Sequence, residues 1–123
     1  MKELTQENFY AAIQECLNTN GYTVLLVTEK MSDQKVIVTD WLRPVEHLIP
    51  HIKKASISSN DIFIAFENGN FIRGISLRSG QILGRRADLV LCEPWMMMDD
   101  DIRAELNRIE YSKRYFRLGE KYD

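Results

Sequence analysis

The stretch YTVLLV, residues 22–27, decides the fold class of this chain. Its residues are apolar or β-prone throughout, without the alternation that marks a strand with one face in water. A strand of this kind is covered on both faces and belongs inside an α/β sheet. Residues 9–17 carry apolar side chains at helical spacing, Thr5 is a suitable N-cap, and Asn20-Gly21 ends the helix. The sequence therefore predicts a helix that leads into a buried strand.

A second helix and a long connector follow this strand. Ser32 or Asp33 can cap the helix. Its buried face is expected to consist of Val36, Ile37 and Trp41, with Val45 as a candidate fourth member. Residues 47–60 are interpreted as a connector that contains at most a short helical turn.

The second half of the chain predicts a hairpin, one more strand and a last helix. Two strands, 61–66 and 71–77, flank Asn68-Gly69, which favours a type I′ turn with positive φ at both residues. Residues 87–91 form a further apolar strand, and the acids at 99–101 begin the last helix. We therefore expect one α/β domain over residues 1–123, a small layered sheet with a β-hairpin and flanking helices.

The charge, the apolar runs and the cysteines of the chain limit the kinds of ligand and the cell compartment that we expect for it. The formal net charge of −2 gives no general attraction to nucleic acid or to anionic membranes. No apolar run approaches the ~20 residues of a membrane span, and the first residues lack a signal segment, so we expect no membrane contact. Cys16 and Cys92 suggest no disulfide framework, which is typical of a cytoplasmic protein.

Three segments, in this order, resemble the ATPase core of phage terminase large subunits, the motors that package DNA. NFYAAIQECLNTNGYTVLLVTEK, residues 8–30, is similar to the helix and strand that follow the phosphate-binding loop. IFIAFENGNFIRGIS, residues 62–76, is similar to the hairpin with an Asn-Gly turn. GRRADLVLCEPW, residues 84–95, is similar to the segment that leads into the Walker B strand. The resemblance covers roughly residues 8–106 and implies a truncated, partial P-loop-NTPase-like fold and a phage origin.

The departures from the family concern its chemistry. The chain contains no G-x-x-x-x-G-K-[ST] loop to hold nucleotide phosphates. Leu83 stands where the family usually has an arginine, and Cys92 stands where its Walker B aspartate helps to hold Mg²⁺, for which a neutral thiol is a poor ligand. Glu93 alone matches the catalytic carboxylate. The resemblance thus implies a non-enzyme without catalytic residues, nucleotide cofactor or metal, unless a partner supplies the phosphate loop.

Two kinds of binding then remain. The first is a protein-interaction module, an inhibitor or decoy in the host cytoplasm with anti-host defence as one role. Strand 87–91, with Leu89, is expected to be an open edge that pairs with a second copy or another protein, unless the hairpin or last helix covers it. The loop Trp95, Met96, Met97 and Met98 is expected to offer a partner surface, against the alternative that it packs in the core.

The second kind is nucleic-acid binding, as an accessory protein of DNA packaging. The middle third of the chain is its basic part, with six Lys or Arg residues against three Asp or Glu in residues 51–90. The residues of the candidate phosphate-binding strip are Arg73, Arg78, Arg85 and Arg86. The alternative is a solvated face with ion pairs to Asp88 or Glu67. His47 and His51 flank Pro50 without further ligand motifs, which argues against a metal site.

Overall fold

The computed structural model describes residues 1–79 and 84–122, with the backbone alone for residues 79, 112 and 114–122, so that Leu83 lies outside the described residues. The chain forms, in order, β1 (Lys2–Glu3), α1 (Gln6–Asn18), β2 (Thr23–Thr28), α2 (Met31–Leu42), η1 (Glu46–Leu48), β3 (Ile52–Ile57), β4 (Ile62–Phe66), β5 (Phe71–Ser76), η2 (Leu77–Ser79), β6 (Leu89–Cys92), α3 (Pro94–Met98) and α4 (Asp100–Tyr122). The predicted α/β class, with a layered sheet and flanking helices, is confirmed.

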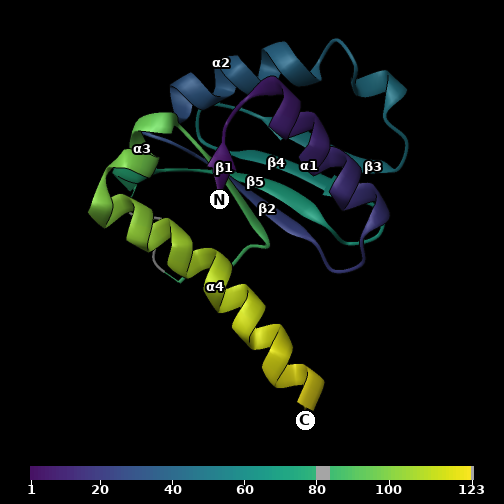
Figure 1. The fold of residues 1–123 in the computed structure, drawn as a ribbon. Helices are drawn as coiled ribbons and strands as arrows, with labels where there is room; N and C mark the ends of the chain where they lie inside the picture. Colours follow the sequence, from purple (N-terminus) through teal and green to yellow (C-terminus); the bar gives the residue numbers. More distant parts are fainter. Residues whose placement is uncertain (80–83, 123) are drawn as a thin grey trace.

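The strands form one mixed, six-stranded sheet in the order β1-β6-β2-β5-β4-β3. Strands β1, β6, β2 and β5 are parallel, whereas β4 is antiparallel to β5 and β3. Helices cover both faces (Figure 1). Helices α1 and α2 pack on one face, and α3 and α4 pack on the other.

Strand β2 supplies core residues to both faces, which explains its unbroken apolar sequence. Val24 and Leu26 point into the core under α1 and α2. Leu25 and Val27 point into the core under α3 and α4. All four side chains are at most 2% exposed. The predicted burial of this strand on both faces is therefore confirmed.

The first helix begins and buries its side chains as predicted. The Thr5 hydroxyl accepts a hydrogen bond from the Asn8 N–H at 3.1 Å and so caps α1. The buried residues of the helix are Phe9, Ala12, Ile13 and Cys16.

The predicted buried face of α2 is correct only for Trp41, which is partly buried against the core under α1 and α2. The buried residues are Gln34, Val38 and Leu42, and Val36 is 69% exposed. A polar residue leads this face because the NH₂ group of its amide is hydrogen-bonded inside the protein. Gln34 Nε2 lies 3.2 Å from the Leu26 carbonyl, 3.0 Å from the Ile75 carbonyl and 3.1 Å from the Thr28 hydroxyl. The amide thus links β2 to the neighbouring β5.

Gly74 in β5 makes room for this amide. A Cβ at position 74 would lie 1.7 Å from Gln34 Oε1 and 2.9 Å from the Ile62 Cβ. Gln34 Oε1 has no hydrogen-bond partner among the described residues, because it rests against the glycine backbone. Gly74 and Gln34 therefore form one packing unit.

The hairpin between β4 and β5 is confirmed, but its turn is not type I′. Gly69 has φ of +90°, and Asn68 does not have the positive φ that a type I′ turn requires. The Phe66 carbonyl accepts from the Gly69 N–H at 3.0 Å, and the Phe66 N–H donates to the Asn70 carbonyl at 2.9 Å. This is the longer hairpin loop in which a left-handed glycine follows an ordinary turn.

Asn70 shows why the longer loop is used. Its buried amide donates to the carbonyls of Cys16 and Thr19, at 2.8 and 2.6 Å, and accepts from the Tyr22 N–H at 2.8 Å. These carbonyls belong to the end of α1, where helical partners are missing. The hairpin loop therefore caps the helix that precedes β2.

The expected open edge at residues 87–91 is wrong. Strand β6 lies between β2 and β1, with Lys2 opposite Leu91 and Glu3 opposite Cys92. On the same outer side, the Val90 N–H donates to Glu110 Oε2 at 2.7 Å, and Glu110 also pairs with the N-terminal ammonium group. The first strand and α4 therefore satisfy the side of β6 that was expected to be free.

The long edge of the sheet is β3, which lies in the segment interpreted as a connector. Its sequence IKKASI contains two exposed lysines and a register shift between Ile52 and Lys54. A bulge interrupts the alternation by which strands are recognised. Edge lysines also discourage pairing with other chains.

We expect Gly74→Ala to lower the free energy of unfolding by about 2–4 kcal/mol, because the new methyl group displaces the buried Gln34 amide from its acceptors. Urea denaturation measures the change. In a Gln34→Ala background the added cost of Gly74→Ala should be smaller, since part of the clash is gone. Equal costs in the two backgrounds would contradict the packing unit.

Candidate binding site at the carboxyl edge of the parallel strands

Three parallel strands, β2, β5 and β6, end at the same edge of the sheet. After β2 the chain enters α2 on one face, and after β6 it enters α3 and α4 on the other face. Open α/β sheets bind ligands where neighbouring strands send their connections to opposite faces. The gap between the ends of β2 and β6 is therefore the candidate site.

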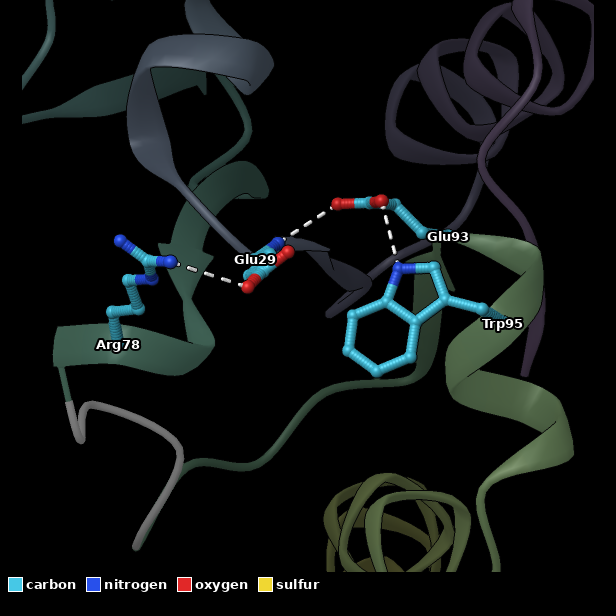
Figure 2. A network of polar contacts seen from close by, with 4 residues as sticks. All are labelled: Glu29, Arg78, Glu93 and Trp95. Carbon is cyan, nitrogen blue, oxygen red and sulfur yellow. Dashed lines mark hydrogen bonds and ion pairs between the residues drawn. The ribbon is translucent and has the colours of Figure 1, made fainter.

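Polar side chains that follow the three strands meet at this gap (Figure 2). Glu93 Oε1 accepts from the backbone N–H of Glu29 at 2.8 Å, and Glu93 Oε2 accepts from the indole N–H of Trp95 at 2.9 Å. Arg78 Nη2 lies 3.4 Å from Glu29 Oε1. The Glu93 carboxylate thus joins the end of β6 to the end of β2 and fixes the orientation of the indole ring.

The chemistry of this edge is acidic. Glu29 and Glu93 bring two carboxylates against one guanidinium group, so the edge repels the phosphates of a nucleotide unless a cation intervenes. Cys92, at the position that resembles the Walker B aspartate, is fully buried in the core under α3 and α4. Among the side chains that the structure describes, no group of three or more His, Cys, Asp or Glu is arranged to hold a metal ion.

The Trp95–Met98 segment is a short helix and not the loop that was expected. Met96 is fully buried in the core, and Met97 is half-buried against it. Trp95 is 41% exposed and Met98 is 84% exposed. They are three positions apart, so they lie on one side of the helix. Met96 and Met97 thus belong to the core, and Trp95 and Met98 are exposed. We name the two exposed side chains the Trp95–Met98 surface.

Leu89 does not belong to this surface. Its side chain is half-buried and packs against the core under α1 and α2. Three exposed acids, Asp99, Asp100 and Asp101, lie directly after Met98. They give the surface a negative rim.

The four arginines of the expected basic strip are not gathered in one place. Arg73 lies within β5, with its guanidinium carbon 4.5 Å from the centre of the Phe63 ring. Arg78 lies at the carboxyl edge beside Glu29, whereas Arg85 and Arg86 precede the start of β6. Because β5 and β6 run in the same direction, the end of β5 and the start of β6 lie at opposite edges of the sheet. Arg78 follows the end of β5 and Arg85 precedes the start of β6, so the two lie at opposite edges.

Glu29 was not among the predicted site residues. Its position directly after the buried strand β2 was an available signal, because polar residues at the carboxyl ends of parallel strands form sites. Glu67, which was considered as a partner for the arginines, lies 2.9 Å from Nδ1 of the exposed His51 instead.

Both cysteines are free and buried, and their thiols are poor nucleophiles. Burial is the main cause that raises the pKa of the Cys92 thiol to about 11 and that of Cys16 to about 12. At Cys16 the carboxylate of Asp88 raises the pKa further, whereas at Cys92 the N-terminal ammonium group lowers the pKa against burial and Glu110 raises it. The attacking form of cysteine is the thiolate, which these environments disfavour.

We expect neither thiol to react with Ellman's reagent at pH 8 in the native protein, and both to react in denaturant, as absorbance at the thiolate product measures. In the unfolded chain the thiols have a pKa near 9.0, whereas in the folded protein their pKa is higher. Above pH 9 the unfolded state therefore loses protons that the folded state keeps, and the free energy of unfolding should fall as the pH rises. A native thiol that reacts as fast as a free one would contradict this description.

No helix among the described residues combines the length and the apolar character needed to cross a membrane. Comparisons of the chain with protein-family models, with curated proteins and with solved structures find no match. The likeness of residues 8–106 to terminase ATPase cores stays a prediction from the quoted motifs.

Proposed function

We propose that the protein is a non-catalytic binding protein that engages a protein partner through the Trp95–Met98 surface. The observation that carries the proposal is the state of Trp95, which is 41% exposed while its indole N–H is already bound to Glu93 at 2.9 Å. Tryptophan is the residue most enriched at the energetic centres of protein interfaces.

The surface is pre-organised for binding. Glu93 holds the indole ring, and the buried Met96 anchors the short helix to the core. Pro94 occupies the first turn of the helix, where its fixed φ is favourable. Side chains that are ordered before binding lose less entropy on association, which raises affinity.

The charge around the surface indicates the kind of partner. Exposed acids at positions 99, 100 and 101 flank Met98, and Arg103 pairs with Asp100 at 2.9 Å. A complementary protein presents an apolar pocket for Trp95 and Met98 with basic side chains on its rim. Methionine adapts to such a pocket because its side chain is unbranched and flexible.

The resemblance suggests the biological setting of this binding. A phage chain derived from a terminase ATPase core, without the phosphate-binding loop, is suited to act as an inhibitor or decoy in the host cytoplasm. The positions of Cys92 inside the core and of Glu93 between two protein donors support a binding role over ATP hydrolysis. A defence protein of the host is one partner class that this setting allows.

The test is site-specific photocrosslinking in cells of the native host. We expect p-benzoylphenylalanine at Met98 to crosslink to one protein, and the same probe at Val36, which is 69% exposed on α2, to give no such product. With the purified partner, Trp95→Ala should weaken binding about 30-fold, the loss of a typical hot spot of roughly 2 kcal/mol. Calorimetry measures this loss.

The matched control is Val36→Ala, which should leave the affinity unchanged. Equal crosslinking from both probe positions would contradict the assigned surface. Magnesium-dependent ATP hydrolysis by the complex that Glu93→Gln abolishes would contradict the non-catalytic role.

A further inference from the structure

We propose that the face of the sheet formed by β3, β4 and β5, opposite to α1 and α2, binds single-stranded nucleic acid. We name it the basic–aromatic face. Its residues are Lys53, Lys54, Phe63, Phe71 and Arg73. This face is separate from the Trp95–Met98 surface of the proposed function. It is formed by β5, β4 and β3 on one side of β2, whereas α3 follows β6, which lies on the other side of β2.

The strand register builds the face in two rows. Lys54, Ala65 and Phe71 stand opposite one another across β3, β4 and β5. Ser56, Phe63 and Arg73 form the next row. The alternate residues of the same strands, among them Ile62, Ile64 and Ile72, are buried under α1 and α2. Alternation in a strand therefore directs both rows to the other face.

Helix α4 leaves this part of the sheet uncovered. It packs against β6 and α3, and its last turns project away from the sheet (Figure 1). A hollow of about 550 Å³ lies on the face, with the two lysines, the two phenylalanines and Ala65 in its lining. Ala65, which is small, lies between Lys54 and Phe71 in the register and lines the hollow.

The charges of the face favour an anionic ligand. Lys53 and Lys54 are exposed, and no ion pair joins either of them to another described residue. Arg73 spreads its guanidinium group over Phe63 at 4.5 Å. No Asp or Glu is among the residues that line the hollow. The face is thus locally basic in a chain whose formal net charge is −2.

The aromatic rings favour a single strand over a duplex or an acidic peptide. Phe63 and Phe71 lie on adjacent strands with ring centres 5.5 Å apart, and both are partly exposed. Exposed bases stack on aromatic rings and on guanidinium planes, whereas the bases of a duplex are stacked on each other and hidden. Cations beside the rings can then neutralise the phosphates.

The experiment is fluorescence anisotropy of labelled oligo-dT and oligo-U strands of about 12 nucleotides, with a duplex of the same length for comparison. We expect single strands to bind more tightly than the duplex. If three cations contact phosphates, log K should fall with log salt with a slope of about −2. Lys53→Ala with Lys54→Ala should reduce this slope to about −0.7.

Phe71→Leu, which keeps an apolar side chain in the hollow, should weaken single-strand binding roughly 5- to 150-fold through lost stacking. Lys35→Ala on the exposed side of α2 and Trp95→Leu on α3 are the matched controls, and both should bind as the wild type does. Thermal unfolding of each variant checks that it is folded.

Two results would overturn the inference: no binding of single strands at low salt, or binding that Phe71→Leu and the double lysine variant leave unchanged in folded protein. Preference for the duplex would equally overturn it. Because Trp95→Leu tests the partner surface and Phe71→Leu tests this face, failure of one proposal leaves the other distinguishable.

Discussion

Strand β2 is hydrogen-bonded on both sides by strands that run in its own direction, and the rest of the structure depends on this arrangement. Parallel neighbours cannot be joined by tight turns, so each connection must cross a face of the sheet. The crossings place helices on both faces, which in turn requires β2 to be apolar on both sides. They also bring the ends of β2, β5 and β6 to one edge, where Glu29, Arg78 and Glu93 meet.

The elements that were predicted well from the sequence either depend on interactions between neighbouring residues or consist of apolar residues throughout. The run at residues 22–27, the Thr5 cap and the Asn68-Gly69 hairpin belong to this group. Prediction failed where a polar group replaces an apolar one inside the core. Gln34 is buried because carbonyls of β2 and β5 accept hydrogen bonds from its NH₂ group, and this pairing cannot be predicted before the neighbours of β2 are known.

The candidate sites also divide into residues that could be predicted from the sequence and residues that could not. Trp95 and Met98 were found from composition, because exposed bulky apolar residues are conspicuous in any segment, but their separation from the buried Met96 required the helix. Of the basic–aromatic face only Arg73 was predicted to bind nucleic acid, since the residues of the face come from three strands and β3 was interpreted as a connector. Lys53 and Lys54 interrupt the pattern of that strand, and the same two lysines keep its edge from pairing with other chains. A charge pattern that protects an edge and one that binds phosphate are thus alike in sequence.

The position of β6 between β2 and β1 has a consequence for how the chain folds. Residue 2 pairs with residue 91, and β2 waits for residues 89–92 before its second side is hydrogen-bonded. Contacts between such distant residues slow folding, because a large loop must close before any pairing stabilises it. During synthesis both sides of the apolar strand β2 stay unpaired until residues 71–76 emerge, and one side stays unpaired until residues 89–92 emerge. The nascent protein is most vulnerable to aggregation in that interval.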